Sequence, residues 1–79
     1  MTTFYYPTLD MEATGSRIRQ LRKEKNLSVN DVCEALNISE QALGKWQKGR
    51  CLPSIDNLYA LSRLLQTRIE DILVENCER

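Results

Sequence analysis

The feature that most constrains the fold of this 79-residue chain is a pair of short helical segments, residues 28–36 and 39–48. They are joined by the three-residue turn Asn37-Ile38-Ser39, whose serine also opens the second segment. Ser28 opens the first segment, because its side chain can accept a hydrogen bond from the Asp31 amide while Asp31 returns one in a capping box. Asn37 follows, and asparagine tolerates the left-handed backbone of a helix end. A second serine then caps the next segment. This spacing predicts a tight helix-turn-helix.

Further stretches carry the apolar period of amphipathic helices. The first begins at Met11, and because Gly15 is a weak helix former inside it, we expect that helix to start near Gly15. Another begins at Pro53 with Ser54 as its cap, and Thr67 opens a short fifth helix. The apolar tracks of these helices are Met11, Thr14, Ile18 and Leu21; Ile55, Leu58, Leu61, Leu64 and Leu65; and Ile69, Ile72 and Leu73.

The predicted fold class is all-α with five short helices, since no segment alternates with the period of a strand. One domain is expected over residues 11–74, with an irregular N-terminal arm at residues 1–10 and a C-terminal tail at residues 75–79. No apolar run reaches the roughly 18 residues of a membrane span, and the N-terminus lacks a secretory pattern. We therefore expect a cytoplasmic protein that does not contact a membrane.

The residue types argue against metal and enzyme chemistry. The three cysteines (Cys33, Cys51 and Cys77) are widely spaced, and the chain has no histidine. Carboxylates would have to complete any zinc site, and neither a Cys–His nucleophilic pair nor a histidine general base can be built. We expect reduced thiols, with no metal, no cofactor and no catalytic residue.

The charge of the chain is zero in total but uneven along it. Residues 17–50 hold eight basic and four acidic side chains, whereas residues 1–16 and 51–79 are each net acidic. A basic middle between acidic ends produces a weak field that steers a polyanion toward one part of the molecule.

The order of these elements makes the sequence recognisable. Residues 27–49 contain a leucine–serine pair, a helix, a turn, an isoleucine–serine pair, and a helix with a late tryptophan and a terminal glycine; Pro53 and Ser54 then open the next helix. This arrangement resembles the lambda repressor/Cro-like helix-turn-helix family from about Gly15 to Leu73. The resemblance implies a five-helix DNA-binding domain whose third helix, residues 39–48, lies in the major groove of double-stranded DNA.

The resemblance also implies which side chains meet DNA. Glutamine can pair with adenine, lysine with guanine and glutamate with cytosine, while a glycine lets the backbone approach closely. Short polar groups at a helix start, and cations, instead contact phosphates and set the register. By position, the base contacts are Glu40, Gln41, Gly44 and Lys45, and the phosphate contacts are Arg22, Ser28, Asn30, Lys48 and Arg50, with Arg17 and Arg19 as weaker candidates.

The sequence departs from the family pattern at four positions. Val29 stands where a glutamine usually clasps a phosphate, and Gln47 stands where an acid usually pairs with an arginine of the first helix. Gln47 can give Arg22 only a neutral hydrogen bond. Asn37 and Gln66 replace glycines at two helix ends.

Two functional hypotheses follow. The first is a sequence-specific transcriptional regulator, a repressor acting as a weak or DNA-induced homodimer on a palindromic site. The dimer would form through Ile69, Ile72, Leu73 and Val74, or through an arm containing Phe4, Tyr5 and Tyr6. The alternative is a protein-interaction module, an antitoxin or adaptor that reuses the fold; the neutral total charge and Val29 favour it. An enzyme is a distant third.

Overall fold

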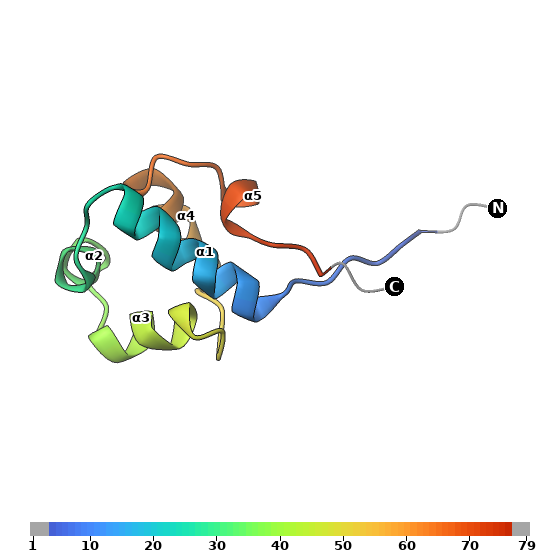
Figure 1. Ribbon diagram of the computed structural model, residues 1–79, viewed down its shortest axis with the longest axis horizontal. Coiled ribbons are helices and arrows are strands. Elements are labelled where there is room, and N and C mark those ends of the chain that lie inside the picture. The colour runs from blue at the N-terminus through green and yellow to red at the C-terminus, as the bar shows by residue number, and fades with distance from the viewer. Residues whose placement is uncertain (1–3, 77–79) are drawn as a thin grey trace.

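The chain folds into five α-helices within residues 4–76, the part that the computed structural model describes. They are α1 (Met11–Glu24), α2 (Val29–Leu36), α3 (Glu40–Gln47), α4 (Ile55–Leu64) and α5 (Ile69–Ile72). Figure 1 shows α2 and α3 joined by a tight turn, with α1 crossing beside α3 and with α4 and α5 closing the other side. The predicted all-α, five-helix fold is confirmed.

The first helix begins four residues earlier than the sequence suggested, at Met11. Asp10 caps it, since its Oδ1 accepts a hydrogen bond from the Ala13 N–H over 2.9 Å. Gly15 lies inside the helix and has a packing reason to be glycine. A Cβ built there would lie 2.3 Å from the carbonyl oxygen of Trp46, at the end of α3. The glycine therefore lets α1 and α3 approach closely.

Serine caps open three of the helices, as predicted. Ser28 Oγ accepts from the Asp31 N–H over 3.0 Å, and Asp31 Oδ2 accepts from the Ser28 N–H over 2.8 Å, which completes the capping box before α2. Ser39 accepts from Ala42 before α3, and Ser54 accepts from Asn57 before α4. These local bonds fix where the helices begin.

Three residues other than glycine take the left-handed conformation after helices: Asn26 (φ 58°), Asn37 (φ 56°) and Gln66 (φ 55°). The prediction for Asn37 is confirmed. Gln66 adopts the left-handed conformation at the position between the last two helices where a glycine is usual. The final helix starts at Ile69, with Arg68 and not Thr67 before it, and no side chain caps it.

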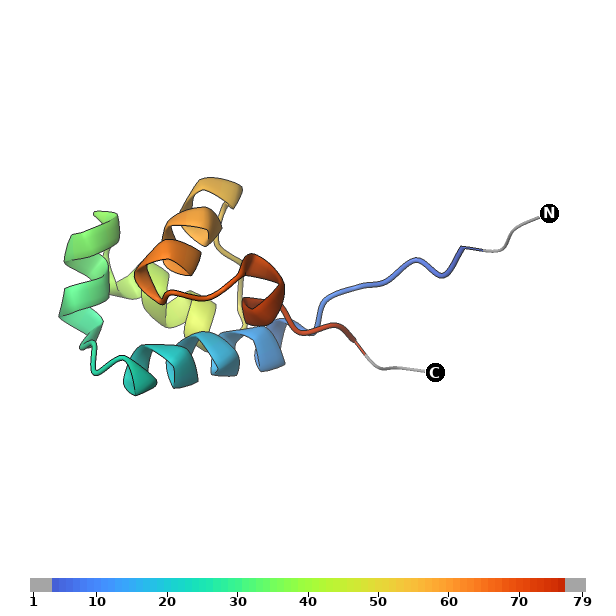
Figure 2. The same cartoon turned by 90° about the horizontal axis from the view of Figure 1, so that it is seen from above.

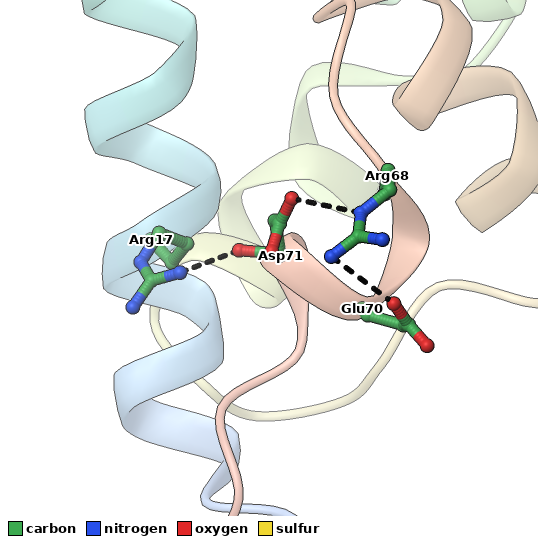
Figure 3. Close-up of polar contacts among 4 residues, drawn as sticks. All are labelled: Arg17, Arg68, Glu70 and Asp71. Carbon is green, nitrogen blue, oxygen red and sulfur yellow. Dashed lines mark hydrogen bonds and ion pairs between the residues drawn. The ribbon is translucent and has the colours of Figure 1, made fainter.

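The core lies where the helices meet. Its buried apolar residues are Ile18, Val32, Cys33, Leu43, Trp46, Leu58, Leu61, Leu65 and Ile72. Ile38 in the turn packs against them, so the turn itself closes the core. Figure 2 shows α5 lying beside α1 and α4. In Figure 3, the Arg17 guanidinium of α1 donates to the carbonyl oxygen of Asp71, while Arg68 pairs with the exposed carboxylates of Glu70 and Asp71.

The two ends of the described chain pair with each other. The Asp10 N–H donates to the Val74 carbonyl over 2.8 Å, and the Asn76 N–H donates to the Thr8 carbonyl over 2.7 Å, which forms an antiparallel bridge between Leu9 and Glu75. We call residues 8–10 and 74–76 the terminal ribbon. It projects from the helical body in Figures 1 and 2. None of the helices described is long and apolar enough to cross a bilayer.

Candidate nucleic-acid interface

The third helix presents two chemically different sides. Leu43 and Trp46 are buried in the core. Glu40, Gln41 and Lys45 are exposed on the outer side. Because the apolar side is fixed by the core, the polar side has one fixed orientation toward solvent.

The exposed side of α3 is hollowed. One shallow depression, which we call the α3 hollow, is lined by Glu40, Gln41, Gly44, Lys45, Lys48 and Arg50. The structure therefore brings together all four predicted base contacts and two of the five predicted phosphate contacts. Three cations and one carboxylate line the α3 hollow, so its charge favours a polyanion.

Within residues 4–76, no neighbouring atom requires residue 44 to be a glycine. A Cβ built on Gly44 meets no atom within 4 Å, and the residue lies within a regular helix turn. A glycine at this position weakens the helix by about 1 kcal/mol relative to alanine. Packing inside the domain therefore gives no reason for it, in contrast to Gly15.

The predicted phosphate contacts at the start of α2 lie outside the α3 hollow. Ser28 and Asn30 are exposed, but the hydroxyl and N–H of Ser28 both bond to Asp31, and Asn30 Nδ2 donates to Glu34 Oε2 over 3.3 Å. The hydrogen bonds to Ser28 hold the pKa of the Asp31 carboxyl below its ordinary value of 3.8. The bond to the Ser28 backbone has a larger effect than the bond to its side chain. Val29 packs against the core.

Arg22 has a structural role that the sequence assignment to phosphate did not include. Its side chain is 9% exposed; Nε donates to Gln47 Oε1 over 3.1 Å, and Nη1 donates to the Leu27 carbonyl over 2.8 Å. The expected neutral bond between Arg22 and Gln47 is confirmed. One guanidinium thus joins α1, the residue before Ser28 and the end of α3, and Arg22 does not line the α3 hollow.

The helical period carried a signal for this burial. Thr14, Ile18 and Arg22 follow one another at intervals of four and are all buried, so they share one face of α1. Arg17, a weaker candidate, instead bonds to Asp71, while Arg19 is exposed on α1. Sequence reasoning also did not identify Gly15 as a positioning residue for α3, because only the fold brings the Trp46 carbonyl to it.

Neither Cys33 nor Cys51 lines this surface. Cys33 is buried in the core, and its burial, with a smaller effect of the Glu40 charge, raises the pKa of its thiol. Cys51 is half-buried, and Cys77 lies outside the described residues. Within residues 4–76, no group of three or more histidine, cysteine, aspartate or glutamate side chains is arranged to hold a metal ion.

Comparison with known proteins gives concordant matches. A helix-turn-helix family model matches residues 18–72. The chain is 32% identical over 59 residues to the transcriptional activator BcrR of Enterococcus faecalis, covering 75% of this chain and 29% of that protein. It is 38% identical over 52 residues to the transcriptional regulator DicA of Escherichia coli K12, covering 66% and 38%. It thus spans well under half the length of these two curated relatives.

The fold is also similar to that of solved repressors. The P22 c2 repressor, in complex with a synthetic operator, superimposes with a TM-score of 0.72 and 30% sequence identity, over 76% of this chain and 91% of that one. The region that the family model matches, residues 18–72, includes the segment from α2 to α4 that builds and orients the α3 hollow.

Proposed function

This chain belongs to the lambda repressor/Cro-like helix-turn-helix family, and from that membership we propose that it is a sequence-specific transcriptional regulator, a repressor that binds double-stranded DNA. The observation that carries the proposal is the α3 hollow. Its six lining residues combine base-reading and phosphate-binding chemistry on the one side of α3 that the core leaves exposed. In bacteria such a regulator acts in the cytoplasm, where the chromosome lies.

The polar side of α3 reads bases in the major groove. Gln41 is suited to adenine, Lys45 to the acceptors of guanine, and Glu40 to the amino group of cytosine. Gly44, which no neighbour in the chain requires, leaves room for the DNA surface. Each good contact of this kind discriminates against a wrong base by about 1–3 kcal/mol.

Phosphate contacts would come from both ends of the helix pair. Lys48 and Arg50 lie in the α3 hollow beside the base-reading residues and would carry most of the electrostatic attraction. Ser28 and Asn30 contribute less, because their polar groups already bond to Asp31 and Glu34. The Val29 side chain has no polar group to hold a phosphate.

The regulator acts as a homodimer on a two-fold site. One domain of this size reads only a few base pairs, and two copies can contact half-sites one helical turn apart, about 34 Å. Dimerisation is weak or induced by DNA. Repression needs only that the dimer occupy its operator.

The test is selection of bound sites from random DNA, followed by a salt titration on the selected site. We expect a two-fold symmetric consensus and a loss of affinity with salt whose slope on a log–log plot is roughly −4, from two cations in each protomer. A scrambled site of equal composition is the control. No enrichment, or binding with no salt dependence, would overturn the proposal and favour the protein-interaction module.

A further inference from the structure

The N-terminal arm exposes a group of aromatic side chains that the helical body does not cover. Phe4, Tyr5 and Tyr6 are 77%, 60% and 78% exposed. The rings of Phe4 and Tyr6 meet edge to face, with their centroids 6.4 Å apart. No charged residue occurs between positions 4 and 9, so two such arms would not repel each other. We call residues 4–9 the aromatic arm.

The other dimer surface suggested by the sequence is largely used by the domain itself. Ile72 of α5 is fully buried, and Ile69 and Leu73 are half-buried against the core. Val74 is also half-buried, and its N–H donates to Thr14 Oγ1 over 3.0 Å. This surface therefore offers less exposed apolar area to a second copy than the aromatic side chains of the arm do.

A smaller apolar surface lies on α4, and Arg63 covers part of it. Arg63 donates to the Tyr59 hydroxyl over 2.6 Å, and its guanidinium carbon lies 5.1 Å from the ring centroid. Ile55 (78% exposed) and Tyr59 (52% exposed) are four residues apart on α4 and so share one face of it. This patch has two apolar side chains, one of them partly covered, whereas the arm has three consecutive exposed aromatic residues.

The backbone of the aromatic arm also has an open edge. In the terminal ribbon, the Thr8 carbonyl accepts from the Asn76 N–H, and the Asp10 N–H donates to the Val74 carbonyl. The N–H and carbonyl of Leu9, which lies between them, therefore point to the opposite edge. Within residues 4–76, no chain segment pairs with that edge. An identical edge from a second copy, related by a two-fold axis, can pair with it in antiparallel fashion. Pro7 lacks an N–H, so the ladder would be short.

We propose that the aromatic arm is the homodimer interface of this protein, and that its occupant is the same arm of a second copy. The proposal rests on the proposed function in one respect: the two copies of the dimer are expected to bind the two half-sites of one DNA site. Burying three rings and Leu9 in both copies removes roughly 1,000 Å² from water. That area is at the lower limit for a specific interface, which fits a weak dimer that DNA strengthens.

The position of the aromatic arm connects arm pairing to α3, the helix that carries the proposed base contacts. It leads through Asp10 directly into α1, whose first turn lies against the end of α3: a Cβ on Gly49 would be 2.7 Å from the Cα of Glu12. Since α1 and α3 are held together at this end, joining two arms also limits the arrangement of the two α3 helices.

The experiment is sedimentation equilibrium of the full chain, up to high micromolar concentration, alone and with DNA carrying one or two half-sites. We expect a weak dimer that the double substitution Phe4→Asp/Tyr6→Asp converts to a monomer. Because both side chains are exposed, the thermal unfolding curve should not change at a concentration where the wild type is also monomeric. Binding to one half-site should be unchanged, while affinity for the two-half-site DNA should fall on the order of 100-fold.

The matched control is Ile55→Asp, which places the same charge on an equally exposed apolar side chain away from the arm. It should leave dimerisation intact. The proposal is overturned if the arm variant dimerises as the wild type does, if Ile55→Asp dissociates the dimer, if the arm variant loses half-site binding equally, or if the wild type stays monomeric with and without DNA. If the arm variant alone dissociates the dimer but no DNA is bound, the interface stands and the DNA-binding proposal fails.

Discussion

Arg22 of α1 donates from Nε to the side-chain oxygen of Gln47 over 3.1 Å, and this bond ties the first helix to the end of the helix that carries the proposed base contacts. The same guanidinium reaches the Leu27 carbonyl over 2.8 Å. Its charge is held among neutral acceptors, since no ion pair involves it within residues 4–76. The bond therefore depends on geometry more than on opposite charge.

Removing the acceptor should destabilise the domain. Gln47→Ala leaves a nearly buried donor of Arg22 unpaired, and we expect a loss of about 1–3 kcal/mol in the free energy of unfolding, measured with urea. Gln47→Glu keeps an acceptor at the same place and should be at least as stable as the wild type at neutral pH. Equal stability of Gln47→Ala and the wild type would show that the bond contributes nothing.

Gly44→Ala should separate stability from DNA binding. The added Cβ meets nothing in the chain, so the free energy of unfolding should rise by about 1 kcal/mol from helix propensity. Affinity for the selected DNA site should fall, because the methyl group occupies space that the DNA surface needs. Gly15→Ala is the contrasting variant, since its Cβ would clash with the Trp46 carbonyl and lower stability. Unchanged DNA affinity in Gly44→Ala would remove Gly44 from the reading surface.

Lys45 and Arg50 should fail in different ways when truncated. Lys45→Ala should relax the base preference at one position of each half-site, with a loss of about 1–3 kcal/mol on the preferred base. Arg50→Ala should weaken all sequences alike and reduce the magnitude of the salt slope by roughly 1 per protomer. Binding to a panel of single-base variants at several salt concentrations measures both. Identical profiles for the two variants would contradict the division between base and phosphate contacts.

The capping box before α2 should make stability depend on acid. Because the pKa of Asp31 is lowered in the folded state, its contribution is fully present above the ordinary value of 3.8 and is lost as pH falls below that value toward the lower folded pKa. Asp31→Asn keeps an acceptor oxygen but removes the titration. The difference in unfolding free energy between wild type and variant should therefore shrink below about pH 4. A difference that stays constant down to pH 2 would exclude this linkage.

Gln66→Gly should stabilise the domain by about 0.5–1 kcal/mol. Gln66 holds a left-handed conformation that a side chain disfavours and glycine adopts freely. The loss of its exposed bond from Lys25 Nζ should cost less than the relief of strain. Gln20→Gly, inside α1, should instead lower stability by about 1 kcal/mol. Thermal unfolding of both variants gives the comparison, and a destabilised Gln66→Gly would be the contrary result.

Much of the local structure was predictable because its causes are local. Serine caps bond to amides three residues away, so Ser28, Ser39 and Ser54 mark the starts of α2, α3 and α4 within the sequence itself. The left-handed Asn37 follows from the same short-range chemistry. With these starts fixed, the apolar period places Trp46 inward and leaves the residues of the α3 hollow outside.

What the sequence did not predict depends on contacts between distant segments. Gly15 looked like a helix boundary, and only the nearby Trp46 carbonyl explains why it lies inside α1. Arg22 looked like a surface cation, although its position four residues after Ile18 places it on the buried face. The pairing of Leu9 with Glu75 spans nearly the whole chain, and no periodicity of either segment announces it.

The terminal ribbon has a mechanical consequence. Residues 8–10 and 74–76 run antiparallel, so the two ends of the described chain leave the helical body at the same pole. Tension between those ends would break the two backbone bonds one after the other, as a zipper opens, and would not stretch them together. The ribbon would therefore separate first under tension. The bond between Arg22 and Gln47, which holds α3 in place, would not yet be strained.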